Sequence, residues 1–207
     1  MTRIIAGAAG SLTLAVPRSG TRPTSDRVRE AIFSALEARD AIEGAAVLDL
    51  YAGSGALGLE AASRGAAEAV LVERAKGAAD VCRRNADAVG RALRGSPTRV
   101  RVVARPVASY LESAVGDFDL VFIDPPYESG ERALAHDLAL LAPLLARDAV
   151  VVVERSSRSP EPAWPEGIVP ERRRDYGETT LWWARADDRP PAHDEPPAQP
   201  ERPSQPA

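Results

Sequence analysis

The tetrapeptide Asp124-Pro125-Pro126-Tyr127 has the residue types of a site that acts on an amine. Because each proline fixes φ and removes a backbone N–H, the turn presents two rigid acceptors, the Asp124 carboxylate and the Pro125 carbonyl. A planar exocyclic amine of a nucleobase offers two N–H donors to such acceptors, and holding both turns its nitrogen toward an electrophilic methyl group. Tyr127 can stack on a base taken out of its helix. An ordinary turn at the end of a strand uses the same residue types. The position of the tetrapeptide directly after an apolar run is what favours a functional site.

A glycine-rich segment lies about 70 residues earlier, within Val47–Gly65. Gly53 and Gly55 allow a sharp bend and the close approach of a ligand. Together with Gly58 they match the G-x-G-x-x-G pattern of dinucleotide sites, in which a pyrophosphate binds a helix N-terminus. Tight packing of a helix on a sheet would use the same glycines, and an NAD(P)-dependent oxidoreductase is compatible with the pattern.

Two acids near these glycines favour a different cofactor. Asp49 precedes the first glycine by four residues and would repel a pyrophosphate, but it suits the ammonium and sulfonium of S-adenosylmethionine. Glu73 ends the next apolar run, where a carboxylate accepts ribose hydroxyls. We therefore predict an S-adenosylmethionine site made by Asp49, Tyr51, Gly53, Gly55 and Glu73, with Thr24 as a candidate at the methionine end.

These segments need a parallel sheet to position them. Short apolar runs alternate with helical patterns, which is typical of buried parallel strands with right-handed crossovers. The predicted strands are Val47–Ala52, Ala69–Glu73, Arg99–Ala104, Asp119–Asp124 and Ala149–Glu154. Two helices are predicted over residues 24–38 and 75–93, and the apolar stripe of the second is Ala78, Cys82, Ala86 (or Val89) and Leu93. A later helix carries the stripe Leu134, Leu138, Leu141 and Leu145 and is expected to end or kink at Pro143.

Hairpins are predicted at both ends of this α/β domain. Ile168–Arg174 and Glu178–Ala184 flank Tyr176-Gly177 and predict an antiparallel C-terminal hairpin, and Arg3–Ala6 and Leu12–Val16 predict a small N-terminal one. The expected fold is Rossmann-like, with a seven-stranded, mostly parallel sheet. We expect an N-terminal hairpin extension over residues 1–20, a catalytic domain over 21–186, and a disordered proline-rich tail over 187–207.

Composition excludes several other kinds of site. The single cysteine, Cys82, rules out an internal disulfide and a multi-cysteine zinc site, and it falls on the predicted buried stripe. The chain has only two histidines, and His136 lies off the apolar stripe of its helix. A catalytic triad or a histidine-rich metal site is therefore not expected. With neither a membrane-length apolar run nor a secretory signal pattern, we expect a cytoplasmic protein with no metal and no membrane partner.

Five segments together resemble the RsmD family of bacterial 16S rRNA guanine-N2 methyltransferases, which belong to the class I S-adenosylmethionine-dependent enzymes. These segments are Arg3–Gly7, Thr21–Leu36, Leu48–Ala66, Asp124–Tyr127 and Tyr176–Leu181. The resemblance implies methylation of a guanine in 16S rRNA, within a partly or fully assembled 30S particle. We expect the protein to act as a monomer. The residues alone leave open an N6-adenine or another nucleic-acid methyltransferase.

Arginines near the first helix are candidates for RNA contact. Arg22, Arg27 and Arg29 cluster there and can contact phosphates, although a solvated helix face or a pair between Arg29 and Asp26 would explain them equally well. The run Arg172–Arg174 is a second candidate, for which a charged edge strand is the plainer explanation. The sequence departs from the family in its uncharged segment Gly7–Leu14 and in Ala104-Arg105-Pro106, where members often carry an acid near the adenine.

Overall fold

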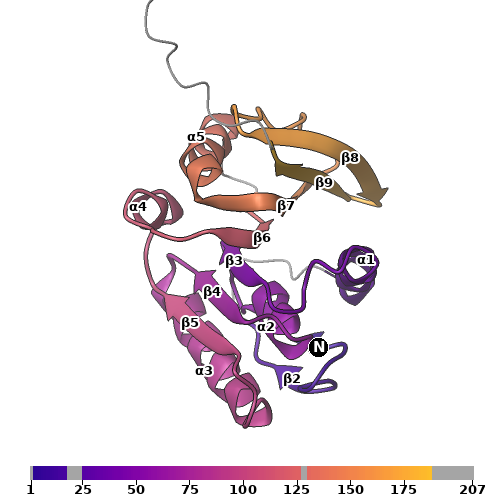
Figure 1. The fold of residues 1–207 in the computed structure, drawn as a ribbon, viewed down its shortest axis with the longest axis vertical. Helices are drawn as coiled ribbons and strands as arrows, with labels where there is room; N and C mark the ends of the chain where they lie inside the picture. The colour runs from indigo at the N-terminus through magenta and orange to yellow at the C-terminus, as the bar shows by residue number, and fades with distance from the viewer. Residues whose placement is uncertain (1, 18–24, 127–129, 188–207) are drawn as a thin grey trace, which may run out of the picture.

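A seven-stranded sheet forms the centre of the computed structural model, which describes residues 2–17, 25–126 and 130–187 of the 207-residue chain. The strand order is β5-β4-β3-β6-β7-β9-β8 (Figure 1). The strands are β3 Ala46–Leu50, β4 Glu68–Val72, β5 Arg99–Val103, β6 Phe118–Ile123, β7 Leu145–Ser156, β8 Ile168–Tyr176 and β9 Thr179–Ala186. The strands β3 to β7 run parallel to one another, and β9 pairs antiparallel with both β7 and β8. The predicted mostly parallel sheet with a C-terminal hairpin is confirmed.

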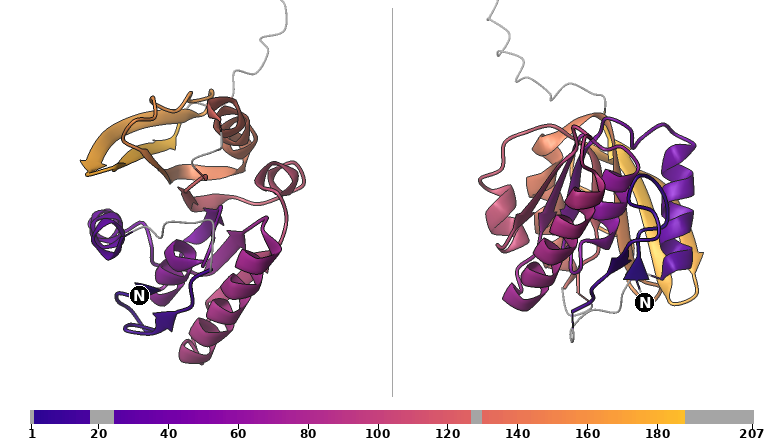
Figure 2. Two further views of the ribbon diagram at one scale, coloured as in Figure 1. Left: turned by 180° about the vertical axis from the view of Figure 1, so that it is seen from behind. Right: turned by 90° about the horizontal axis from the view of Figure 1, so that it is seen from below.

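Helices cover both faces of this sheet. They are α1 Asp26–Glu37, α2 Ala56–Ser63, α3 Lys76–Ala92, α4 Val107–Leu111 and α5 Glu131–Leu141. The helices α1 and α2 lie on one side of the sheet, and α4 and α5 lie on the other (Figures 1 and 2). A 3₁₀ turn, Ala142–Leu144, follows α5, so Pro143 ends this helix as predicted.

Two apolar cores form because side chains alternate between the two faces of each buried strand. On β3, Val47 packs with the core that α1, α2 and α3 share, whereas Leu48 packs with the core under α4 and α5. On β6, Phe122 and Ile123 divide in the same way. Strands buried on both faces therefore appear as continuous apolar runs in the sequence.

The connections reverse direction between β3 and β6. The chain runs from β3 outward to β4 and β5, then returns to β6 on the other side of β3. After β3 and β6, which are neighbouring parallel strands, the chain leaves toward opposite edges of the sheet. Open α/β sheets bind ligands at the carboxyl ends of such a strand pair. Both motifs found in the sequence lie at this point.

Element boundaries differ modestly from those predicted. The strands β3 to β6 end one or two residues earlier than predicted; β3 stops at Leu50 because Tyr51 takes a left-handed backbone, with φ 63°. The strand β7 extends past both predicted ends, and Leu145, predicted on the preceding helix, is its first residue. The helix α1 begins after Ser25, whose hydroxyl accepts from the Val28 N–H as an N-cap. The buried residues of α3 are Ala79, Val81, Cys82, Asn85 and Val89, and its C-cap Leu93 is buried in the same core. The predicted stripe is thus confirmed at Cys82, Val89 and Leu93, whereas Ala79 takes the buried place predicted for Ala78.

The N-terminal hairpin is shorter than predicted. Its strands are only β1 Thr2–Arg3 and β2 Thr13–Leu14, which pair antiparallel. Backbone bonds continue between Ile4 and Leu12, and beyond them the segment bonds to α2: Ala8 N–H donates to the Ser63 carbonyl and Ala9 N–H to the Ser63 hydroxyl. At the other end, Asp187 N–H still donates to the Gly167 carbonyl, and the tail from residue 188 lies outside the described residues.

Candidate active site

The Asp-Pro-Pro turn and the glycine loop lie side by side at the tips of β6 and β3. Leu50 and Ile123 are paired in the parallel register, and the Asp124 N–H donates to the Leu50 carbonyl at 3.4 Å. Asp124 is half-buried, Pro125 is buried and Pro126 is exposed. Tyr127, predicted to stack on the base, lies outside the described residues. The structure thus brings Asp124 next to the loop that starts at Tyr51.

A small pocket opens between the tips of β6 and β7. Its lining consists of Asp124, Pro125, Glu154, Arg155, Ser156 and Ser159. Arg155 is buried and forms an ion pair with Glu131 in the first turn of α5. The predicted acceptor turn therefore forms one wall of a pocket, and the end of β7 forms the other.

Asp49 is buried beneath the glycine loop. Its Oδ2 accepts the Gly58 N–H at 2.9 Å, and the residue is 2% exposed. Burial raises the pKa of Asp49 to about 7, the Gly58 hydrogen bond opposes this shift, and the nearby charge of Glu73 adds to it. A carboxylate desolvated in this way gains strongly from a cationic ligand group. Such a carboxylate would suit a cofactor that carries an ammonium and a sulfonium.

Glu73 holds the glycine loop from the tip of β4. Its Oε2 accepts the Gly53 N–H at 2.9 Å, and its Oε1 accepts the Ala75 N–H at 2.6 Å. Gly53 and Gly55 have φ of 56° and 80°, a conformation that suits glycine. Glu73 is half-buried, and each of its carboxylate oxygens keeps a lone pair with which it could accept a ribose hydroxyl. The residues therefore fit S-adenosylmethionine, and two carboxylates at this loop oppose a pyrophosphate.

Packing explains part of the glycine pattern. A Cβ on Gly55 would lie 2.8 Å from the Cys82 Sγ and 2.8 Å from the Leu71 Cδ2. A Cβ on Gly58 would lie 3.1 Å from the Asp49 Cβ. These two glycines bring α2 close to β3, β4 and α3, so the helix–sheet packing interpretation holds for them. Cys82 is buried, as predicted, and burial raises its thiol pKa, which leaves it unreactive.

Tyr51 was predicted to contact the cofactor, but its hydroxyl points to α5. It donates to the Asp137 Oδ2, and Asp137 is itself buried. Burial and this hydrogen bond raise the pKa of the Tyr51 phenol, and burial raises the pKa of the Asp137 carboxyl. Sequence reasoning missed Asp137, although an acid on the apolar stripe between Leu134 and Leu138 is a detectable signal. The neighbouring His136 lies off this buried stripe, as predicted.

Asn85 of α3 connects the glycine loop to the N-terminal segment. Its side chain accepts the Ala15 N–H at 2.9 Å and donates to the Ala15 carbonyl at 2.9 Å. The same Nδ2 donates to the Ser54 carbonyl at 2.8 Å. In the sequence, Asn85 is only a polar residue on the buried side of a helix. Its hydrogen bonds to Ala15 and Ser54 become visible only in the tertiary structure.

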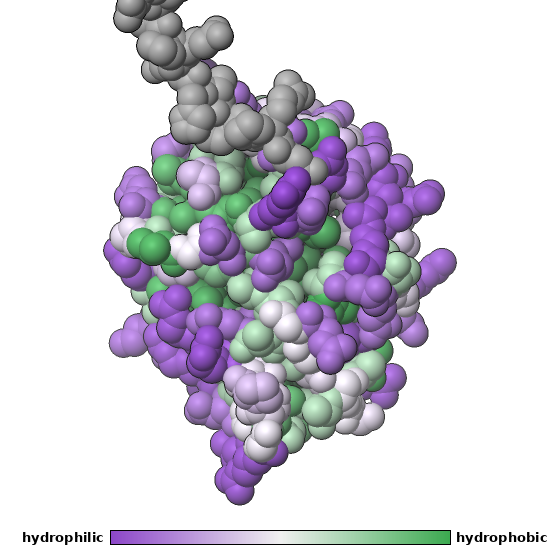
Figure 3. All heavy atoms as spheres, viewed as in Figure 1, coloured by the Kyte–Doolittle hydropathy of each residue, from purple (hydrophilic) through white to green (hydrophobic). Residues whose placement is uncertain are grey.

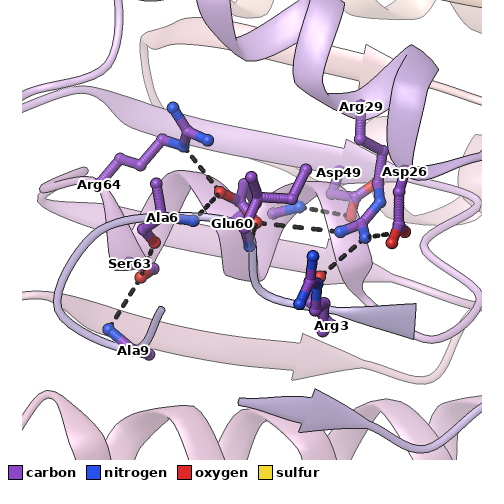
Figure 4. A network of polar contacts seen from close by, with 11 residues as sticks. Arg3, Ala6, Ala9, Asp26, Arg29, Asp49, Glu60, Ser63 and Arg64 are labelled. Carbon is purple, nitrogen blue, oxygen red and sulfur yellow. Dashed lines mark hydrogen bonds and ion pairs between the residues drawn. The ribbon is translucent and has the colours of Figure 1, made fainter. Parts of the chain in front are cut away.

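A buried acid, Glu60 of α2, anchors the N-terminal segment (Figure 4). Its oxygens accept the Ile5 N–H at 2.6 Å and the Ala6 N–H at 3.0 Å. Arg64 Nε lies 2.7 Å from one oxygen and Arg29 Nη1 lies 3.9 Å from the other. Gly7 must approach α2 closely here, since a Cβ would lie 1.9 Å from the Ser63 carbonyl oxygen. Glu60 thus joins α1, α2 and residues 5–6.

The predicted RNA contact of Arg29 is wrong. Its side chain is 0% exposed, and it donates to the Arg3 carbonyl at 2.7 Å and to Asp26 at 2.7 Å (Figure 4). The helix face that carries Val28, Ile32 and Phe33 also carries Arg29, so the guanidinium is directed inward. The pairing with Asp26, which the sequence left open, is the one observed.

The remaining arginine candidates differ in where they lie. Arg27 is exposed on α1, and Arg22 and Thr24 lie outside the described residues. The run Arg172–Arg174 is on β8, the edge strand of the sheet, where Arg172 stacks 4.5 Å over the Trp183 ring and Arg173 5.2 Å over the Trp182 ring. Hydrophilic side chains gather over β8 and α1 (Figure 3).

Neither a metal centre nor a membrane span is present in the described part of the chain. Across residues 2–17, 25–126 and 130–187, no group of three or more His, Cys, Asp or Glu side chains is placed to hold a metal ion. Within the same ranges, no helix has the length and apolar character needed to cross a membrane.

Comparisons with known proteins agree with this architecture. The chain is 36% identical over 177 residues to Ribosomal RNA small subunit methyltransferase D of Escherichia coli K12, an alignment that covers 85% of each chain. Its structure is similar to that of the E. coli protein yhhF, with a TM-score of 0.77 and 33% identity over 91% of this chain and 99% of that one. A hypothetical protein from Thermus thermophilus gives a TM-score of 0.74 and 35% identity, over 88% of this chain and 98% of that one.

The family assignment rests on nearly the whole folded part of the chain. The profile of Conserved hypothetical protein 95 matches residues 2–185, a span that includes the glycine loop, the Asp-Pro-Pro turn and the C-terminal hairpin. The chain therefore belongs to the Conserved hypothetical protein 95 family, which is the RsmD family that its motifs resemble.

Proposed function

We propose that this protein transfers a methyl group from S-adenosylmethionine to the exocyclic N2 of a guanine in 16S rRNA of the small ribosomal subunit. The observation that carries the proposal is the juxtaposition of the Asp124-Pro125 acceptors with the glycine loop across the β3–β6 pair. The name of the E. coli relative supports an RNA of the small subunit as the substrate. An assembled particle as substrate is what the family resemblance implies, and action as a monomer stays an expectation.

The cofactor supplies an electrophilic methyl group on a sulfonium when it is bound. Asp49 and Glu73 would hold it from two sides of the glycine loop, the first toward its cationic part and the second toward its ribose. Gly53 lets the backbone approach it. Because Asp49 is desolvated, its attraction for a cation is stronger than that of an exposed acid.

The Asp-Pro-Pro turn would orient the amine. The Asp124 carboxylate and the Pro125 carbonyl accept the two N–H groups, and Pro126 stiffens the turn. With both hydrogens held, the nitrogen lone pair would face the methyl group that the cofactor supplies, and the Asp124 carboxylate would take the amine proton and pass it to water. Positioning of this kind lowers a barrier by roughly 7–11 kcal/mol in favourable cases. Tyr127 as a stacking residue stays a prediction from the sequence, and Arg27 is the described candidate for phosphate contact.

Methylation assays test this proposal. Tritiated methyl incorporation would be measured into 30S particles, free 16S rRNA and DNA, followed by nucleoside analysis of the product. We expect N2-methylguanosine; N6-methyladenosine or a DNA product would contradict the proposal. Calorimetry with NAD(H) and with S-adenosylhomocysteine distinguishes an oxidoreductase.

The variant Asp124→Ala tests the mechanism. It should bind S-adenosylhomocysteine like the parent and lose at least about 100-fold in turnover, because the amine is no longer oriented. Asp117→Ala, at the exposed amino end of β6, is the matched control and should retain full turnover. Unchanged methyl transfer by the Asp124 variant would refute the mechanism.

A further inference from the structure

The pocket beside the Asp-Pro-Pro turn has a second carboxylate, which the reaction as proposed does not use. Glu154, at the end of β7, lines it together with Asp124, Pro125 and Arg155. An acid at this place is unnecessary for holding an amine, since the carboxylate and carbonyl of the turn already supply two acceptors. The chemistry of the substrate base gives it a role.

Strand register places the two acids next to each other. Ile123 and Val153 are paired in the parallel ladder, and Asp124 and Glu154 are the residues that follow them. Two residues earlier on each strand, Phe122 and Val152 both pack in the core on the α1–α2 side. Since side chains alternate along a strand, Glu154 lies on that side of β7, and Asp124, the first residue after β6, lines the same pocket, with the two backbones about one strand spacing, or roughly 5 Å, apart.

Purines differ in what lies beside the reactive amine. On guanine, the N2 amine is adjacent to N1–H, which is a donor. On adenine, the N6 amine is adjacent to N1, which is an acceptor. A base removed from its helix is read by hydrogen bonds to this edge. An acceptor beside Asp124 therefore matches the N1–H of guanine. With adenine, the lone pair of this acceptor would face the lone pair of N1.

We propose that Glu154 accepts the N1–H of the target guanine and so makes the site specific for guanine over a purine without that proton. This inference rests on the proposed function, because it concerns the base that the Asp-Pro-Pro turn orients. A site that hydrogen-bonds a particular donor discriminates strongly against an analogue lacking it, because the buried acceptor is then left unpaired. Arg155, the next residue on β7, lines the same pocket and pairs with Glu131 of α5.

The test compares guanine with 2,6-diaminopurine, which keeps the N2 amine but has an acceptor at N1. Once the methylated guanine has been mapped with the parent enzyme, a synthetic RNA segment with 2,6-diaminopurine at that position is ligated into 16S rRNA, which is then assembled into 30S particles. We expect the parent to prefer guanine by about 100-fold or more in kcat/KM. Glu154→Gln, whose amide can donate to N1, should shift this ratio at least about 100-fold toward 2,6-diaminopurine.

Further variants separate a substrate contact from a structural role. Glu154→Asp keeps an acceptor and should keep the preference for guanine at a lower rate. Glu166→Gln, in the connection between β7 and β8, should leave both the rate and the ratio unchanged. Because the readout is a ratio between two substrates, a loss of folded protein does not alter it.

The outcomes distinguish the two proposals. If the parent enzyme forms no N2-methylguanosine, the proposed function fails. If the parent forms it but Glu154→Gln keeps the parent's ratio of guanine to 2,6-diaminopurine, the function stands and the role of Glu154 is refuted. A Glu154→Asp variant that loses the preference as fully as Glu154→Gln would also overturn it.

Discussion

Replacing Glu60 with glutamine tests whether a buried acid anchors the N-terminal segment. The carboxylate accepts two backbone N–H groups and the Arg64 Nε, at distances between 2.6 and 3.0 Å, and has the buried Arg29 nearby. An amide of the same size keeps one acceptor oxygen but turns an NH₂ toward donors on the other side. It also removes the negative charge between two buried guanidinium groups.

The expected loss is large. A hydrogen bond to a charged group contributes about 1.5–3 kcal/mol, and at least one such bond is lost. Removing one partner of a buried ion pair costs about 3–5 kcal/mol. We therefore expect Glu60→Gln to lower the free energy of unfolding by about 3–5 kcal/mol, a substantial part of the roughly 5–15 kcal/mol typical of a domain.

Urea unfolding followed by tryptophan fluorescence measures this loss. The control is Glu37→Gln: Glu37 also pairs with Arg64, at 2.6 Å, but its side chain is 55% exposed, so about 0–1 kcal/mol is expected. A Glu60→Gln protein within about 1 kcal/mol of the parent, with an unchanged dependence on urea, would refute the reasoning, since the burial of Glu60 would then have no effect on stability.

Three further predictions concern the site. First, the pKa of Asp49 is raised to about 7, so this carboxyl lowers the free energy of unfolding as pH rises from near 4 through 7. When a cation binds beside it, the carboxyl loses its proton. Affinity for S-adenosylhomocysteine should therefore rise about tenfold from pH 6 to pH 8, and calorimetry in buffers of different ionisation enthalpy should detect the proton; Asp49→Asn should flatten this dependence. Second, Asn85→Ala should lower stability by about 2–4 kcal/mol and weaken S-adenosylhomocysteine binding, since three hydrogen bonds, including that to Ser54, are removed; urea unfolding and calorimetry measure both. Third, Tyr51→Phe should cost about 1–3 kcal/mol in urea unfolding near pH 7, because Asp137 stays buried without its donor.

Two control variants serve these predictions, one for the variants of Asp49 and Asn85 and one for Tyr51→Phe. Asp87→Asn, on the exposed side of α3, and His136→Ala, beside Asp137 but off the buried stripe of α5, should both behave like the parent. An affinity for S-adenosylhomocysteine that is flat from pH 6 to pH 8 would contradict the role of Asp49. Parent-like stability of Asn85→Ala or of Tyr51→Phe would mean that the corresponding hydrogen bonds are replaced by water.

Local sequence patterns were sufficient for the sheet and for the two motifs. Strands buried on both faces produce continuous apolar runs, and the motifs Gly53–Gly55 and Asp124–Pro126 closely follow two of these runs. Since parallel strands end at one edge, the sequence order alone implied that the motifs lie at the same edge. The 3₁₀ turn at Pro143 and the burial of Cys82 followed from equally local rules.

Contacts between distant residues decided what the polar side chains do. The sequence shows Arg29 as one of several arginines near α1, and only the packing of α1 on α2 makes it an internal residue bonded to Arg3 and Asp26. Likewise, Glu60 is one acid within a helix until residues 5–6 fold back onto it. The type of a side chain fixes its donors and acceptors, but the partner depends on which backbone segment the fold brings within reach.

The sequence by itself determined the fold class, the mostly parallel sheet and the two loops that meet above β3 and β6, because these follow from periodicity and chain direction. Only the tertiary structure decided that Asp49 is desolvated, that Tyr51 bonds to Asp137, and that Glu154 lines the pocket beside Asp124. Burial and strand register are properties of segments far apart in the chain, and no local pattern contains them.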